Sequence, residues 1–176
     1  MAIKTYPPQF LFYIQIIIDN IEGGFSDHKA DTGGKTMYGI TERLARAHGY
    51  QGDMRKLSKD EAIDIYYEEF WKGKVSSHIK NHLAFHLFDC SINSGYSRAV
   101  KILQEALGIA PDGLLGVDTV NAISQHTEKE IIYLFAINRM YFYSTLSNYA
   151  TFGKGWRNRL LKLSNLDWEL EAEHYE

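Results

Sequence analysis

An apolar stretch that stops abruptly at a glutamate and a run of glycines constrains this chain more than any other feature. Residues 10–21 are dominated by Phe, Ile, Leu and Tyr, which predicts a central helix over about 8–21, apolar on nearly all sides. Glu22 follows at the end of that stretch, and five glycines lie between residues 23 and 39. Such a density of glycine and polar residues does not continue a helix, so residues 22–41 are predicted to form a loop with a turn or hairpin.

Two carboxylates in this loop suit the cleavage of a glycosidic bond. Glu22, at the end of an apolar helix, lies where desolvation raises a carboxyl pKa, as a general acid requires. The helix dipole disfavours a carboxylate there, so its presence calls for another reason. A turn in the loop can bring Asp31 back toward Glu22, and two carboxylates in different surroundings are what glycoside hydrolysis uses. Asp31 as a simple turn former and Asp27 as the second carboxylate are the alternatives.

Three short motifs in this region resemble a known family. Glu-Gly-Gly-Phe at 22–25, Asp-Thr-Gly-Gly-Lys-Thr at 31–36 and Tyr-Gly-Ile-Thr at 38–41 are similar to the signature of glycoside hydrolase family 108. Its members are bacterial and phage N-acetylmuramidases, some described as secretion activator proteins. More distantly, Glu22, Asp31 and Thr36 resemble the Glu–Asp–Thr set of phage-type lysozymes. The resemblance implies a mainly α, lysozyme-like helical fold with a small hairpin near the active site.

The second half of the chain resembles a different kind of module. Residues 100–108, 112–116 and 119–123 are similar to the short helical repeat of peptidoglycan-binding modules, which follows the muramidase part in family 108. The resemblance predicts a muramidase region over residues 1–92 and a helical peptidoglycan-binding-like lobe over residues 93–176. We expect the two to pack as one compact fold.

The family resemblance implies a peptidoglycan hydrolase whose partners are glycan strands. It would cleave the β-1,4 bond between N-acetylmuramic acid and N-acetylglucosamine by general acid/base catalysis, with inversion at the anomeric carbon. Glu22 would act as the acid, and Asp31 with Thr36 would activate water. Two alternatives stay open: a lytic transglycosylase, in which one Glu serves as acid and then base, and a non-catalytic wall-binding protein that assists secretion.

Three further residues are candidates for substrate binding. Phe25 and Tyr38 would line the sugar cleft, although aromatic side chains in such a hairpin also serve as packing. Asn93 would donate to an N-acetyl group of the sugar or, alternatively, cap the following helix. Thr36 has its own structural alternative, because its hydroxyl can satisfy a loop amide.

Composition and side-chain spacing argue against several other classes. A formal net charge of −3 and a pI near 6.2 are not those of a general nucleic-acid binder. Three histidines spaced four residues apart lack the His-Glu-x-x-His pattern or a cysteine cluster, so neither a metal nor another cofactor is expected. The histidines are His78, His82 and His86. The single cysteine, Cys90, cannot form an intrachain disulfide and is expected to be a small buried residue.

The apolar run at the start of the chain is neither a membrane span nor a secretion signal. Residues 10–18 are too few to cross a bilayer, and no small-residue cleavage site follows them. We therefore expect no integral membrane segment and a protein made in the cytoplasm without a recognisable signal peptide. It would act on the cell wall or in the periplasm after export or lysis. We also expect a monomer.

Local signals place the remaining helices. Ser58-Lys-Asp-Glu61 and Thr127-Glu-Lys-Glu130 are capping boxes, which predict helix starts at those positions. The helix that begins at Thr127 is expected to run to about Tyr149. Gly153 and Gly155 are expected to separate it from a last helix. The predicted helices span about residues 8–21, 41–48, 58–71, 79–93, 98–107, 117–124, 127–149 and 156–174.

Overall fold

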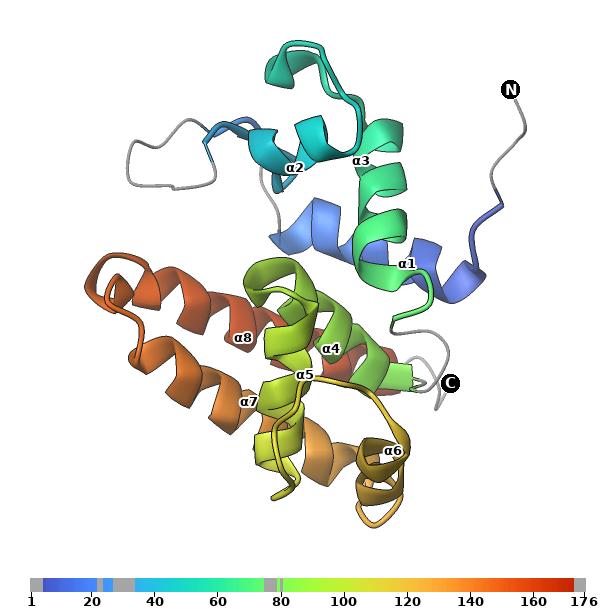
Figure 1. Ribbon diagram of the computed structural model, residues 1–176, viewed down its shortest axis with the longest axis vertical. Coiled ribbons are helices and arrows are strands. Elements are labelled where there is room, and N and C mark those ends of the chain that lie inside the picture. Colours follow the sequence, from blue (N-terminus) through green and yellow to red (C-terminus); the bar gives the residue numbers. More distant parts are fainter. Residues whose placement is uncertain (1–4, 22–23, 27–33, 75–78, 80, 173–176) are drawn as a thin grey trace. The chain divides into compact units, whose positions relative to one another are not determined.

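The computed structural model describes residues 5–21, 24–26, 34–74, 79 and 81–172, and the chain divides into two compact units (Figure 1). The units are Met1–Lys72 and Gly73–Glu176. Both are built mainly from helices, and the described residues contain one small two-stranded hairpin, which confirms the mainly α, lysozyme-like fold. The predicted functional boundary at residues 92–93 stays a prediction. Within the described ranges, no helix combines the length and apolar character needed to cross a membrane.

The first helix carries the chain to the edge of the glycine-rich loop. Helix α1 (Pro8–Ile16) starts at a proline, a residue that suits the first turn because that turn needs no N–H donor. A π-helical turn, η1 (Ile17–Ile21), extends it over the whole predicted span. Phe10 and Ile17 are fully buried, so this helix is central to its unit. Single π-helical turns of this kind are frequent at functional sites.

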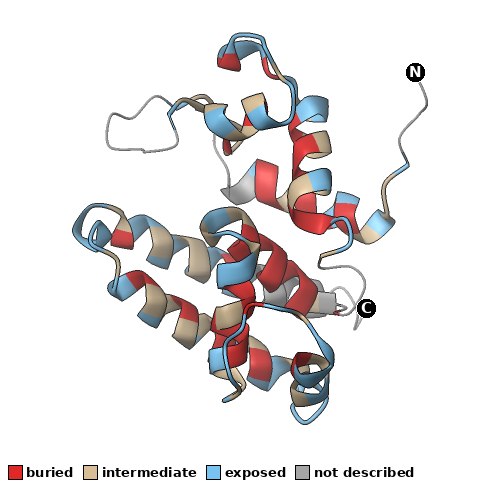
Figure 2. Ribbon diagram, viewed as in Figure 1, coloured by how far each residue is buried: buried red, intermediate tan, exposed pale blue. Residues whose placement is uncertain are grey.

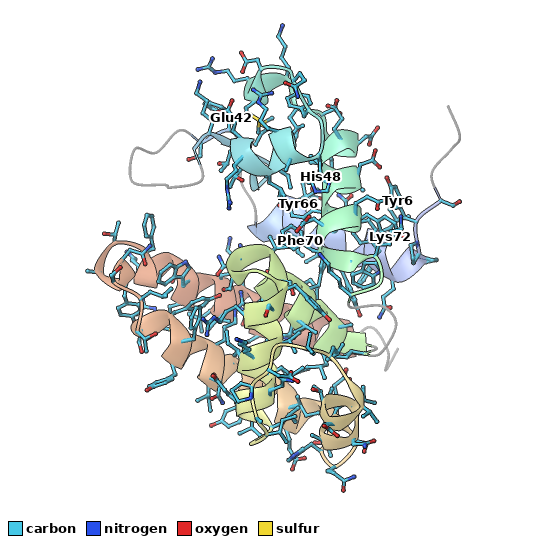
Figure 3. The ribbon with its side chains drawn as sticks, viewed as in Figure 1. Tyr6, Glu42, His48, Tyr66, Phe70 and Lys72 are labelled. Carbon is cyan, nitrogen blue, oxygen red and sulfur yellow. The ribbon has the colours of Figure 1, made fainter. Side chains whose placement is uncertain are left out.

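Helix α3 (Lys59–Tyr66) and its continuation η3 (Tyr67–Trp71) pack against α1 through aromatic rings. The Phe10 ring centroid lies 5.1 Å from that of Tyr67 and 5.6 Å from that of Trp71. Tyr6 joins the cluster, with its ring 5.1 Å from Tyr67 (Figure 3). Edge-on and tilted ring pairs at these separations stabilise a core beyond the area they bury. This cluster anchors the helix that precedes the candidate site.

The short elements of the first unit lie between α1 and α3 in the sequence. They are β1 (Thr36–Met37), β2 (Ile40–Thr41), α2 (Glu42–Ala47) and the 3-10 turn η2 (Met54–Lys56). The predicted capping box at the start of α3 is confirmed, because Ser58 Oγ accepts from the backbone N–H of Glu61 and the Glu61 carboxylate accepts from that of Ser58.

The second unit is a helical bundle around α4. Residues 83–91 of α4 are all buried (red in Figure 2), and α4 confirms the helix predicted over about residues 79–93. Helix α4 packs against α5 and α7, α5 also packs against α7, and α7 pairs with α8 as a hairpin of helices (Figure 1). The elements are α4 (Asn81–Ser94), α5 (Tyr96–Ala106), α6 (Val117–Ile123), α7 (Glu128–Ser144) and α8 (Tyr149–Ala172).

A buried glutamine shapes the loop between α5 and α6. Gln104 Nε2 donates to Asp112 Oδ1 (2.7 Å) and to the carbonyl of Leu114 (3.0 Å), while its Oε1 accepts from the N–H of Gly113 (2.8 Å). Gly113 has φ +80°, and a Cβ added there would lie 2.4 Å from Ser97 Oγ. Only glycine satisfies both the left-handed backbone and this close approach. The loop of the peptidoglycan-binding-like repeat is therefore held in one conformation from inside the unit.

The prediction that Gly153 and Gly155 break the chain between two helices is wrong. Helix α7 ends at Ser144, and α8 begins at Tyr149 and continues through both glycines. The Tyr149 ring occupies the space beside Gly153, where an added Cβ would lie 2.6 Å from the ring. The glycine thus makes room for a side chain of the same helix instead of ending it.

Candidate active site

The hairpin β1–β2 carries two of the predicted site residues, Thr36 and Tyr38. Its strands are antiparallel and pair Thr36 with Thr41 and Met37 with Ile40. Ser26 pairs with the other edge of β1: its N–H donates to the Thr36 carbonyl and the Thr36 N–H donates to the Ser26 carbonyl, both at 2.9 Å. This pairing brings the segment that carries Phe25 next to Thr36. Two predicted site residues are thus adjacent.

The turn of this hairpin is strained. Tyr38 and Gly39 have φ values of +51° and +77°, the signs that a two-residue type I′ turn requires. A positive φ is rare for a bulky residue such as tyrosine, and left-handed backbone costs about 1–2 kcal/mol for a residue with a side chain. The hydroxyl of Tyr66, a fully buried residue of α3, donates to the Tyr38 carbonyl (2.8 Å) and holds the turn. Strain of this kind is concentrated at functional sites.

Tyr66→Phe is expected to lower the free energy of unfolding by about 0.5–1.5 kcal/mol, because it removes one hydrogen bond and leaves the ring in place. Urea unfolding of the purified variant measures the change. Tyr133→Phe is the matched control, since that side chain is 67% exposed and its variant should unfold as the wild type does. An unchanged stability for Tyr66→Phe would show that the turn does not depend on this bond.

One cation lies against Phe25, and two others lie close enough to Asp53 to act on its pKa. The guanidinium carbon of Arg55, in η2, lies 4.9 Å from the Phe25 ring centroid, a cation–π distance. The pKa of the Asp53 carboxyl is lowered by the hydrogen bond that it accepts from the N–H of Arg55 (2.9 Å). The charges of Arg55, Lys35 and Lys56 lower it further, but more weakly. Sequence reasoning missed this group, although the adjacent Arg55 and Lys56 were a visible signal. A cationic edge of this kind suits an anionic polymer.

The end of the first helix is tied to α3 just before the candidate acid. Lys59 Nζ lies 3.0 Å from Asp19 Oδ1, and Gln15 donates to the same carboxylate. The hydrogen bond from Lys59, with that from Gln15, lowers the pKa of the Asp19 carboxyl. Glu22 comes three positions after Asp19. Glu22, Asp31 and the alternative Asp27 lie outside the described residues, so their roles stay predictions.

The remaining predicted site residues occupy distinct settings. Thr36 is half-buried, and in the described part of the chain its hydroxyl has no hydrogen-bond partner, so its role stays a prediction. Tyr38 and Phe25 are also half-buried. Asn93 lies near the end of α4 in the second unit, is exposed, and accepts a hydrogen bond from the Tyr143 hydroxyl (2.7 Å). The N-cap residue of α5 is Gly95, and no side chain caps that helix, so Asn93, which bonds to Tyr143, does not cap α5.

Other side chains with chemical potential come from outside the hairpin sequence. A surface pocket of about 590 Å³ is lined by His48, Tyr50 and carboxylates of α3, and by none of the predicted site residues. Over the described ranges, no group of three or more His, Cys, Asp or Glu side chains is placed to hold a metal ion. Cys90 is buried, as predicted, and that burial raises the pKa of its thiol.

Comparison with known proteins gives matches for both halves of the chain. Residues 15–95 match the family model described as glycosyl hydrolase 108, and residues 98–161 match the model described as predicted peptidoglycan domain. The structure of Brucella abortus SagA is similar, with a TM-score of 0.78 and 32% sequence identity over 88% of this chain and 91% of that chain. Comparison with curated protein sequences gives no match.

Proposed function

This chain belongs to the glycosyl hydrolase 108 family, and we propose that it hydrolyses the β-1,4 bond between N-acetylmuramic acid and N-acetylglucosamine in peptidoglycan. The observation that carries the proposal is the order of the two family matches. A hydrolase over residues 15–95 is followed directly by a peptidoglycan domain over residues 98–161. Joining the two in one chain raises the effective concentration of the wall polymer at the hydrolase.

The proposed chemistry uses one acid and one base. Glu22, protonated at the end of an apolar helix, gives its proton to the leaving glycosidic oxygen. As that bond breaks, positive charge develops at the anomeric carbon. Asp31 takes a proton from water, which Thr36 helps to hold, and the oxygen of that water attacks the anomeric carbon from the opposite face. The product is inverted at that carbon.

The hairpin supports this assignment because it can hold Thr36 rigidly. The backbone of Thr36 is hydrogen-bonded to Ser26, and the residue pairs with Thr41 on its other side. The strand is therefore held on one side by the hydrogen bonds to Ser26 and on the other by its pairing with β2, which limits how far the hydroxyl can move. A misplacement of a reactant by about 1 Å can cost about 10²-fold in rate, so a rigid support for the water is favourable. Phe25 and Tyr38 would contact the sugar rings from the same hairpin region.

Product analysis tests the proposal. Wild-type protein incubated with purified peptidoglycan is expected to release fragments with reducing N-acetylmuramic acid ends, seen by mass spectrometry after borohydride reduction. Fragments with 1,6-anhydro ends would indicate a lytic transglycosylase instead. The absence of any fragment, with the wall still bound, would indicate a non-catalytic wall-binding protein. NMR of the first-formed anomer decides between inversion and retention, and boiled protein is the control.

A further inference from the structure

A chain of polar groups runs through the core of the second unit. Asp89 of α4 is 0% exposed, and the guanidinium groups of two arginines lie against its carboxylate. Arg139 Nη1 of α7 is 2.7 Å from Asp89 Oδ2, and Arg159 Nη2 of α8 is 2.8 Å from Asp89 Oδ1. Burial acts to raise the pKa of Asp89, but the charges of Arg159 and Arg139 outweigh it and hold that pKa below its usual value. Arg139 is therefore fixed as a cation by a buried carboxylate.

Arg139 sets the direction of the next hydrogen bonds. Its Nε lies 2.6 Å from the Tyr143 hydroxyl, and a guanidinium can only donate. The Tyr143 oxygen therefore accepts from Arg139, and its own proton is left to be donated to Asn93 Oδ1, 2.7 Å away. Burial raises the pKa of Tyr143, so the hydroxyl keeps this proton. The Tyr143 ring is stacked on Trp156, with centroids 4.9 Å apart, which holds its position.

The orientation of the Asn93 amide follows from these constraints. The oxygen and nitrogen of an amide side chain are distinguished by their hydrogen bonds, and a donating Tyr143 hydroxyl requires the amide oxygen, not the nitrogen, at its side. The Ser94 hydroxyl also lies on the Oδ1 side (3.3 Å). Asn93 Nδ2 has no hydrogen-bond partner in the part of the chain that the structure describes, and the residue is exposed. The network thus leaves a directed N–H donor for a ligand.

We propose that Arg139 and Tyr143 are positioning residues that keep the Nδ2 amide of Asn93 available to donate to the carbonyl oxygen of a sugar N-acetyl group. The inference rests on the proposed function, because both sugars of the glycan strand carry N-acetyl groups. A fixed N–H donor favours a carbonyl acceptor and disfavours a free amine, which is a cation and a donor. The site should therefore distinguish acetylated from deacetylated glycan.

Binding in a hydrolysis-deficient background tests this inference. Each protein carries Glu22→Gln, so that the wall is not consumed, and its affinity for insoluble peptidoglycan is measured by co-sedimentation. Asn93→Ala and Tyr143→Phe should each weaken binding roughly threefold to tenfold, the loss expected for one hydrogen bond. The double variant should be no weaker than Asn93→Ala alone, because Tyr143 acts through Asn93. Tyr141→Phe, at a position 69% exposed on the same helix, is the matched control and should bind normally.

A second ligand separates positioning from a general structural role. Wild-type Asn93 and Tyr143 should favour N-acetylated over chemically N-deacetylated peptidoglycan, and both single variants should lose that preference. A structural role for Tyr143 would instead give the same loss with or without Asn93 and would leave the preference intact, which overturns the inference. If Tyr143→Phe does not fold, Asn93→Asp decides, because it keeps the oxygen beside Tyr143 and removes the N–H donor. Unchanged binding by Asn93→Asp overturns the inference.

Failure of the proposed function would be detected by a separate measurement, the release of fragments from peptidoglycan. In that case wild-type protein would release no fragments from peptidoglycan, a measurement that does not involve Asn93. If instead the wild type hydrolyses the wall while Asn93→Ala and Tyr143→Phe bind it normally, the hydrolase assignment stands and the positioning role is refuted.

Discussion

Glu22→Gln is expected to lower the initial rate of peptidoglycan clearance by about 10²–10⁴-fold, the usual contribution of a general acid. Glutamine has nearly the same size as glutamic acid but has no proton to give to the leaving oxygen. The variant should fold normally, because the helix that precedes residue 22 is held by the aromatic cluster of Phe10 and Trp71. Turbidity loss of a peptidoglycan suspension measures the rate, and circular dichroism checks the fold.

Two comparisons make this result specific. Glu105→Gln, at an exposed position of α5, makes the same substitution far along the chain and should clear the wall at the wild-type rate. Asp31→Asn should also be strongly impaired, whereas Asp27→Asn should retain most activity if Asp31 is the base. A Glu22→Gln protein that clears peptidoglycan as fast as wild type would refute the acid assignment.

Asp89→Ala is expected to lower the free energy of unfolding of the protein by about 3–5 kcal/mol, the usual cost of removing one partner of a buried ion pair. The substitution would leave the Arg139 and Arg159 cations, which are 1% and 11% exposed, without the carboxylate between them. Urea unfolding measures the change. Glu68→Gln, which removes a partly exposed pair with Lys72, is the control and should change stability by no more than about 0.5 kcal/mol. Equal stability losses in the two variants would contradict the expectation.

The Asp89 carboxylate also makes the free energy of unfolding depend on pH. Because the pKa of Asp89 is lower in the folded than in the unfolded state, its ionised form favours folding. That contribution is complete above the unfolded-state pKa of about 3.9 and is lost as pH falls from there through the folded-state pKa. Wild-type protein should therefore lose stability below about pH 4 more steeply than Asp89→Ala does, when urea midpoints are compared across pH.

The parts of the structure that sequence reasoning predicted well are local. The capping boxes at Ser58 and Thr127 join groups three residues apart, so their hydrogen bonds follow from the order of residues alone. The hairpin expected within residues 22–41 is present at Thr36–Thr41, where Tyr38 and Gly39 form its turn. The family motifs lie in the same short segment, which is why the order of residues was enough to name the candidate site.

One local prediction failed because a tertiary contact outweighed a residue preference. Glycines usually interrupt helices, and two of them suggested a break near residue 154. In the structure, the Tyr149 ring lies over Gly153 and next to the Trp156 ring (6.3 Å between centroids). The packing of these rings in the second unit compensates for the low helix propensity of glycine, so the break falls earlier, after Ser144.

By itself the sequence determined the family, the mainly helical class, the helix caps and the hairpin, because each depends on residues close together in the chain. Only the tertiary structure decided which polar groups meet. Asp89 and Arg159 are 70 positions apart, and Asn93 and Tyr143 are 50 positions apart, so no spacing rule relates them. Their contacts depend on which faces of α4, α7 and α8 pack together, and packing is a property of the whole core.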